Sequence, residues 1–198
     1  MKHLTKFGVL LALTFGACAD SSPNVILETD LGTIEVEVYL DKAPISGADF
    51  LKYVDEGLYD GQGFYRTVRP DNDPRSMGMS LIQGGRLDGE PITPPIAHEA
   101  TYETGLSNSA GSISIARDAP GTGSAAYFFI NIGDNNFLDF GGERNPDGQG
   151  YAAFGTVIDG MDVVKSIQAR EANGKSDLPV TDNQYLTQPV LIKKAYRK

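Results

Sequence analysis

The chain has 198 residues, of which 40% are hydrophobic and 22% are charged, and its net charge is −9. This length suits one domain with a substantial core, and the composition is that of a globular protein, not of a disordered chain or a membrane bundle. An acidic chain is repelled by phosphate backbones, so nucleic acid is not an expected partner. With one cysteine, the chain has no second thiol for an internal disulfide.

The first residues have the pattern of an export signal. A basic start with Lys2, His3 and Lys6 precedes an apolar run over residues 7–17, and small residues follow. The predicted signal therefore spans residues 1–17. Its removal lowers Lys+Arg from 17 to 15 against 26 Asp+Glu, which changes the net charge from −9 to −11.

Two processing sites compete around the only cysteine, Cys18. One is Phe15-Gly16-Ala17-Cys18, which resembles a bacterial lipoprotein box and makes Cys18 the lipidated first residue. The other is Ala17-Cys18-Ala19, a small-x-small cleavage site. We favour the lipoprotein, with residues 18–23 as a tether, a lipid anchor as the only membrane attachment, and a place in the periplasm or outer membrane. Cleavage after Ala19 predicts a soluble periplasmic protein.

Alternating apolar residues after the tether predict short strands, and two segments with helical spacing predict helices. The predicted strands span residues 25–29, 33–40, 64–68, 80–83, 112–116, 127–132, 152–158 and 190–196. The helices are predicted from Pro44 towards Gly57 and over residues 161–169. Strands without βαβ alternation predict a mainly β domain over residues 24–198: a closed eight-stranded antiparallel barrel capped by two α-helices. Its large inward side chains are expected to fill the interior, which argues against an enclosed ligand.

The usual catalytic groups are scarce in this chain. The two histidines are His3, inside the predicted signal, and His98, and no glycine-flanked serine accompanies them. One histidine without an available cysteine makes a poor zinc site. The glycine-rich residues 119–124 lack the Gly-Lys ending of a phosphate loop, and the acidic residues in 134–147 lack calcium-loop spacing. We therefore predict no metal and no cofactor, and we interpret His98 as a surface or packing residue.

Five short segments follow one another at informative spacings. They are Phe64-Tyr65-Arg66, Leu81-Ile82-Gln83-Gly84-Gly85, Tyr127-Phe128-Phe129-Ile130-Asn131, Phe137-Leu138-Asp139 and Phe154-Gly155. In this order, with Arg66 seventeen residues before Gln83, they resemble the cyclophilin family of peptidyl-prolyl cis/trans isomerases, and most closely its exported bacterial members. The resemblance covers residues 24–198. It implies a cyclophilin-like barrel and a reaction that needs no acid, base, nucleophile or metal.

The resemblance also assigns the site residues. It implies that Arg66 is the catalytic cation, supported by a hydrogen bond to Gln83. It places the proline ring against Phe129 and Leu138. The other substrate-binding positions that it implies are Leu81, Phe137, Tyr127, Tyr151 and Arg117.

The chain departs from many family members at several of these positions. Tyr127 stands for a glutamine, Phe137 for a tryptophan, Tyr151 for a histidine and Arg117 for an asparagine. Ser80 stands where a pocket phenylalanine is common. We expect Met77 or Met79, at the end of an inserted loop over residues 70–78, to supply the missing wall.

Two functions from different classes remain open. The first is a monomeric peptidyl-prolyl isomerase that accelerates X-Pro isomerisation in exported or envelope proteins, with X-Pro peptides and unfolded envelope proteins as partners. The second is a low-activity cyclophilin-like module or chaperone that binds proline peptides. Retention of Arg66 favours the isomerase, whereas Ser80 and Tyr127 favour the binding module.

Overall fold

The computed structural model describes residues 22–75, 77–89, 91–175 and 181–198. The predicted export signal, Cys18 and most of the tether lie outside the described residues. None of the helices in the described ranges has both the length and the apolar character needed to cross a membrane.

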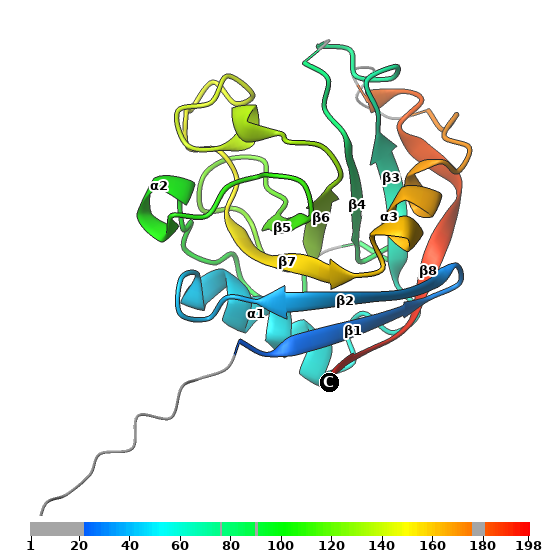
Figure 1. The fold of residues 1–198 in the computed structure, drawn as a ribbon, viewed down its shortest axis with the longest axis horizontal. Helices are drawn as coiled ribbons and strands as arrows, with labels where there is room; N and C mark the ends of the chain where they lie inside the picture. Colours follow the sequence, from blue (N-terminus) through cyan, green and yellow to red (C-terminus); the bar gives the residue numbers. More distant parts are fainter. Residues whose placement is uncertain (1–21, 76, 90, 176–180) are drawn as a thin grey trace, which may run out of the picture.

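Eight antiparallel strands form the body of the domain (Figure 1). They are β1 (Asn24–Thr29), β2 (Gly32–Val38), β3 (Gly63–Val68), β4 (Leu81–Gly85), β5 (Ser112–Ile115), β6 (Tyr127–Asn131), β7 (Ala153–Asp159) and β8 (Tyr185–Arg197). The strand order is β1-β2-β7-β5-β6-β4-β3-β8, and the barrel closes because β8 pairs with both β1 and β3. The predicted mainly β, closed eight-stranded barrel is confirmed.

Two helices cap this barrel, as predicted. Helix α1 (Pro44–Asp55) packs against β7 and β8, and α3 (Met161–Gln168) packs against β2, β3 and β4. Pro44 suits the start of α1 because its fixed φ is helical and it has no N–H to satisfy. The carboxylate of the distant Glu99 accepts the free N–H groups of Ile45 and Ser46 at 3.0 and 2.7 Å, which replaces a local N-cap.

Two single turns were not predicted. They are the short helix α2 (Thr101–Thr104) and the 3-10 helix η1 (Asn136–Leu138). Segments of three or four residues are too short to show a helical period in the sequence. The turn η1 matters for function because it carries Leu138.

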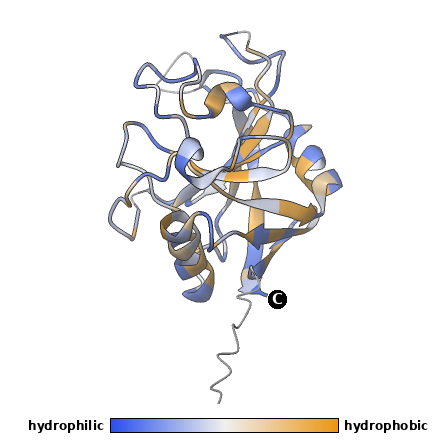
Figure 2. Ribbon diagram, turned by 60° about the vertical axis from the view of Figure 1, so that its left-hand side comes forward, coloured by the Kyte–Doolittle hydropathy of each residue, from blue (hydrophilic) through white to orange (hydrophobic). Residues whose placement is uncertain are grey.

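The main hydrophobic core fills the interior of the barrel. Phe64, Phe128 and Phe154 point inward and are fully buried, and the Phe50 ring of α1 lies 5.7 Å from Phe128 and 5.1 Å from Phe154. Figure 2 shows hydrophobic residues concentrated on the strands and hydrophilic ones on the connecting loops. The interior is therefore occupied by side chains, as the sequence predicted.

A second, smaller apolar cluster lies outside the barrel. On β4 and β6 the residues Ile82, Phe128 and Ile130 belong to the interior core, whereas their neighbours Leu81 and Phe129 belong to the outer cluster. This follows from the alternation of side chains along a strand. Its buried members are Val68, Met79, Leu81, Phe129 and Leu138.

Strand β8 begins at Tyr185, five residues before the predicted start at residue 190. Pro189 lies within the added stretch and cannot donate a ladder hydrogen bond. In the structure the pairing with β3 is irregular across this stretch: Phe64 lies opposite Val190, but Arg66 lies opposite Tyr185. The strand therefore continues past the proline, and its first residues reach the site beside Arg66.

Candidate active site

A cleft of about 670 Å³ opens on the outer face of β3, β4 and β6. Eight of the predicted site residues line it: Arg66, Leu81, Gln83, Arg117, Tyr127, Phe129, Leu138 and Tyr151. Phe137 packs against the outer apolar cluster but is not among the lining residues. The structure thus brings together residues from segments that are far apart in the sequence.

A β-bulge in β3 places Arg66 in this cleft. Phe64 lies opposite Gly84 and Arg66 lies opposite Gln83, so Tyr65 is an extra residue in the pairing. Regular alternation would put Phe64 and Arg66 on one face of the strand. Because of the bulge, Phe64 points into the core while both Tyr65 and Arg66 line the cleft.

The two glycines after Gln83 allow β4 to pack closely between its neighbours. A Cβ at Gly84 would lie 2.6 Å from the Phe64 ring, and one at Gly85 would lie 2.0 Å from the carbonyl oxygen of Ala126. Only glycine fits at these positions without moving β3 or β6.

Two glutamines hold the guanidinium of Arg66. Its Nη1 donates to Oε1 of Gln83 at 2.7 Å, while Nε and Nη2 donate to Oε1 of Gln184 at 3.0 and 2.5 Å. A guanidinium has five N–H donors, so two remain for a ligand. Within the described ranges, Arg66 forms no ion pair with a carboxylate.

Both glutamines are fixed at their other ends. Nε2 of Gln83 donates to the Tyr65 hydroxyl at 2.9 Å, and Nε2 of Gln184 donates to the carbonyl oxygen of Asn72 at 2.9 Å. The backbone carbonyl of Gln184 also accepts the N–H of Thr67 at 2.8 Å. The Arg66 side chain is therefore held in one orientation before any substrate arrives.

Gln184 was not among the predicted site residues. It lies 118 residues after Arg66 and immediately before β8, and its side chain is almost completely buried. Nothing in the local sequence distinguishes it from other polar loop residues. Only the irregular pairing of β3 with β8 brings it to the guanidinium.

Burial changes the ionisation of the central pair. It lowers the pKa of Arg66 below that of a free guanidinium, and the nearby charge of Arg144 acts in the same direction, whereas Tyr185 and Tyr65 oppose it. Burial also raises the pKa of Tyr65. An arginine stays charged in proteins at neutral pH, and a cation in a site of lower polarity interacts more strongly with a ligand than one in water does.

The apolar wall of the cleft is formed by Phe129, Leu138, Leu81 and Met79, all of which are buried. Phe129 is also held from the side by Tyr151, whose ring meets it edge-on with centroids 5.3 Å apart. A pocket of this kind suits a small apolar ring, because its walls are fixed by packing on the barrel.

Met79, directly after the inserted loop over residues 70–78, supplies part of this wall. The Asp73 carboxylate accepts the backbone N–H groups of Arg75, Met77 and Met79 at 3.2, 3.0 and 3.3 Å, and this closes the loop on itself. Of the two expected methionines, Met79 lines the cleft and Met77 does not. The Ser80 hydroxyl accepts a hydrogen bond from Gln168 of α3 at 2.9 Å and does not line the cleft.

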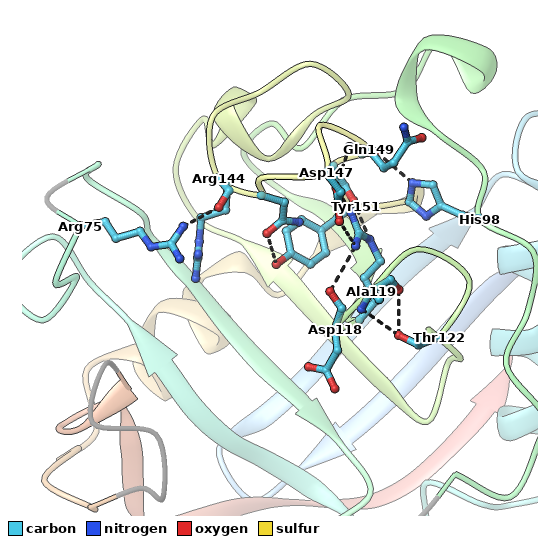
Figure 3. A network of polar contacts seen from close by, with 12 residues as sticks. Arg75, His98, Asp118, Ala119, Thr122, Arg144, Asp147, Gln149 and Tyr151 are labelled. Carbon is cyan, nitrogen blue, oxygen red and sulfur yellow. Dashed lines mark hydrogen bonds and ion pairs between the residues drawn. The ribbon is translucent and has the colours of Figure 1, made fainter.

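Arg117 lies on the opposite wall, where all five of its donors have partners. It pairs with the Asp147 carboxylate at 2.9 and 3.0 Å, and it also donates to the carbonyl oxygens of Gly150 and Asp118. Its side chain is only 2% exposed. Its guanidinium also lies 5.3 Å from the centre of the Tyr151 ring, so it fixes this side of the cleft. Figure 3 shows three of its partners, Asp118, Asp147 and Tyr151.

The remaining polar candidates have local partners. The Tyr127 hydroxyl donates to the carbonyl oxygen of Gly89 at the rim of the cleft. His98 does not line the cleft, and its Nε2 lies 3.0 Å from the carbonyl oxygen of Gln149. Among the residues that the structure describes, no group of three or more His, Cys, Asp or Glu side chains is arranged to hold a metal ion.

Comparison with known proteins decides the family. The sequence model of the cyclophilin-type peptidyl-prolyl cis-trans isomerases matches residues 24–197. The chain belongs to this family. It is 39% identical to a peptidyl-prolyl cis-trans isomerase of Acinetobacter baylyi, over 80% of this chain and 79% of the relative. It is 37% identical to peptidyl-prolyl cis-trans isomerase B of Escherichia coli, over 80% of this chain and 93% of the relative.

Solved structures show the same fold. A cyclophilin-type peptidyl-prolyl cis-trans isomerase of Cryptosporidium parvum superimposes with a TM-score of 0.66 at 19% identity, covering 89% of this chain and 97% of the other. The same Cryptosporidium protein was also solved in the presence of the dipeptide Ala-Pro, and that structure matches with a TM-score of 0.65. The predicted family, its barrel fold and its class of enzyme, an isomerase, are confirmed.

Proposed function

We propose that this cyclophilin catalyses X-Pro isomerisation with Arg66 as its catalytic residue and the wall of Phe129, Leu138 and Leu81 as its proline pocket. The observation that carries this assignment is the state of Arg66. It is fixed from two sides by Gln83 and Gln184, and among the described residues it has no carboxylate partner and keeps two N–H donors beside an apolar pocket.

The reaction needs little more than this arrangement. An X-Pro amide rotates slowly because resonance gives the C–N bond partial double character, with a barrier of about 18 to 20 kcal/mol. At the top of the barrier the amide is twisted, resonance is lost and the nitrogen becomes basic. A fixed cationic donor binds this state better than either planar isomer, and differential binding of this kind lowers the barrier.

Each part of the cleft then has a defined task. The apolar wall grips the proline ring, so that the amide rotates while the ring stays in place. Gln83 and Gln184 position Arg66, which keeps the cost of orienting the guanidinium out of the reaction. Tyr127 and Tyr151 border the space next to Phe129, and Arg117 supports Tyr151 without donors to spare.

A protease-free isomerisation assay tests the proposal. Exchange between the cis and trans forms of a blocked X-Pro peptide is followed by NMR with and without the protein. Catalysed exchange that is lost in Arg66→Ala is expected. Binding of the peptide without faster exchange would instead identify a proline-peptide binding module, the alternative that Ser80 and Tyr127 favour.

We also propose that the enzyme is an exported lipoprotein that acts on unfolded envelope proteins. Support comes from the basic and apolar residues 1–17 and from Cys18 directly after them. Wild-type protein is expected to partition into detergent, and Cys18→Ser should release it or leave the precursor unprocessed. A soluble wild-type protein that begins at Asp20 would overturn the lipid anchor but not the export.

A further inference from the structure

The cleft differs in charge from the rest of the protein. The whole chain carries a net charge of −9, yet the described residues that line the cleft include four arginines and one carboxylate, Asp118. Arg66 and Arg117 already have roles. The other two arginines, Arg75 and Arg144, take no part in the isomerisation described above.

Arg75 and Arg144 meet at one end of the cleft. Nη1 of Arg75 donates to the backbone carbonyl oxygen of Arg144, and both residues line the cleft (Figure 3). One comes from the inserted loop over residues 70–78 and the other from the polar loop over residues 141–150. Neither belongs to a barrel strand, so the pair depends on two loops that meet.

Neither arginine is neutralised within the described chain. No described carboxylate forms an ion pair with either of them. Nε of Arg144 is buried and has no hydrogen-bond partner. Like charges in one cleft repel each other, and a buried donor without a partner is unfavourable. An anionic group bound between the two side chains would relieve both.

This end of the cleft is also electrostatically connected to the catalytic residue. The charge of Arg144 acts on Arg66 and helps to lower its pKa. Arg144 and Arg66 line the same cleft, so a ligand that reaches Arg144 lies in the cleft of the reacting amide and not on a separate surface.

We propose that Arg75 and Arg144 form a subsite for a carboxylate side chain, so that the enzyme prefers proline-containing segments with Asp or Glu close to the proline. This inference rests on the proposed function of the cleft. The planar guanidinium matches a carboxylate with two parallel hydrogen bonds. Since the substrate is a peptide chain held across the cleft, an acidic side chain of that chain is the anion that the subsite meets.

Matched peptides test this preference. The X-Pro peptides are blocked at both ends, so that no terminal carboxylate is present. Each peptide carries Glu or Gln at one of four positions, which are the two residues before and the two residues after the X-Pro pair. Isomerisation is measured by NMR exchange, and binding by titration. At one position or more, kcat/KM for the Glu peptide should exceed that for the Gln peptide by about three- to tenfold. This effect lies between those expected for an exposed ion pair and for a charge-assisted hydrogen bond. Added salt should reduce this ratio.

Variants connect the preference to the two side chains. Arg144→Gln and Arg75→Gln should each lower the Glu-to-Gln ratio, and the double variant should bring it close to one. Arg75 is exposed, so its variant stays informative even if Arg144→Gln folds poorly. Arg170→Gln is the control, because Arg170 is exposed and does not line the cleft, and it should keep the wild-type ratio.

The outcomes separate the two proposals. Equal kcat/KM for Glu and Gln peptides at every position, or a preference that survives the double variant, would overturn the subsite and leave the isomerase intact. Absence of turnover with all peptides would overturn the isomerase. In that case the binding constants of the Glu and Gln peptides still test the subsite, because the same preference for Glu is expected in binding.

Discussion

The two walls of the cleft each present an arginine, and the two are held in opposite ways. Arg117 is paired with the Asp147 carboxylate and has a protein acceptor for every donor. Among the described residues, Arg66 is held only by the neutral oxygens of Gln83 and Gln184, and it keeps two donors. Both are largely enclosed, so burial does not distinguish them.

The partner distinguishes them. A carboxylate cancels the charge of its arginine and accepts the donors that a ligand would need, so Arg117 stabilises the fold of its wall. A carboxamide oxygen orients the guanidinium and leaves its charge uncompensated. Arg66 is therefore available to a developing lone pair on the substrate, and this is the property that electrostatic catalysis requires.

Removal of the uncompensated arginine tests this distinction most directly. Arg66→Ala should lower kcat/KM by about 10- to 200-fold, because one charged hydrogen bond contributes about 1.5 to 3 kcal/mol and about 1.4 kcal/mol corresponds to a factor of ten in rate. Arg66→Lys should recover little, since a point charge cannot replace the planar fork. The rates come from the protease-free NMR assay.

Circular dichroism and thermal unfolding serve as the control for these variants. Arg66 lies at the surface of a cleft and outside both apolar clusters, so the variants should remain folded. A folded Arg66→Ala protein with wild-type kcat/KM would show that the catalytic residue lies elsewhere.

A second variant gives Arg66 the kind of partner that Arg117 has. Gln184→Glu places a carboxylate where the Gln184 carboxamide now accepts two of the Arg66 hydrogen bonds. The charge of Arg66 is then offset, and the hydrogen bond from Nε2 of Gln184 to the Asn72 carbonyl oxygen is lost as well. We expect kcat/KM to fall by roughly tenfold, which corresponds to about 1.4 kcal/mol.

Gln188→Glu is the matched control for this variant. Gln188 lies four residues later in β8 and is exposed, so the same added charge should leave kcat/KM within twofold of wild type, as expected for an exposed charge. An unchanged rate in Gln184→Glu would mean that charge on Arg66 is not what accelerates the reaction.

The contrast between the two arginines also marks what sequence reasoning can reach. The alternation of apolar residues predicts all eight strands, because one face of each strand must enter a common core. The lining of the cleft by Leu81, Gln83 and Phe129 follows from the same alternation together with the family resemblance. These features depend on residues that are neighbours along one strand.

Gln83 was predicted as a partner of Arg66, but the other features that set the state of each arginine were not predictable in this way. The bulge at Tyr65 reverses the face on which Arg66 lies, and the sequence of β3 contains no sign of it. Gln184 and Asp147 come from loops, and only three-dimensional packing selects them from many similar polar residues. The role of Arg117 was accordingly predicted as substrate binding, whereas the structure gives partners within the protein to all five of its donors.

Loss of the compensated arginine should affect stability more than catalysis. Arg117→Ala leaves Asp147 without its partner, and the free energy of unfolding in urea at neutral pH should fall by about 1 to 3 kcal/mol, the usual effect of hydrogen bonds to a charged group. Turnover per folded molecule should change only a few-fold, since Tyr151 still borders the cleft.

The pH dependence of this loss of stability shows whether it comes from the ion pair between Arg117 and Asp147. The hydrogen bonds from Arg117 hold the pKa of Asp147 below its ordinary value of 3.8. A carboxyl group whose pKa is lowered in the folded state stabilises the protein above its unfolded pKa, and this stabilisation is lost as the pH falls through the folded pKa. The gap between wild type and Arg117→Ala should therefore be complete at neutral pH and shrink below pH 3.8. A gap that stays constant down to about pH 2 would assign the effect to packing and not to the ion pair.

The smallest effect is expected from pH on catalysis itself. The described residues that line the cleft include no histidine or cysteine, the side chains that ionise nearest to neutral pH. Burial raises the pKa of Tyr65, which moves it further from neutrality. Burial lowers the pKa of Arg66 below that of a free guanidinium, but an arginine in a protein remains charged at neutral pH. Wild-type kcat/KM should thus vary by less than about twofold between pH 6 and pH 8. A bell-shaped profile in this range would mean that proton transfer takes part in the reaction, and Arg66 alone would no longer account for it.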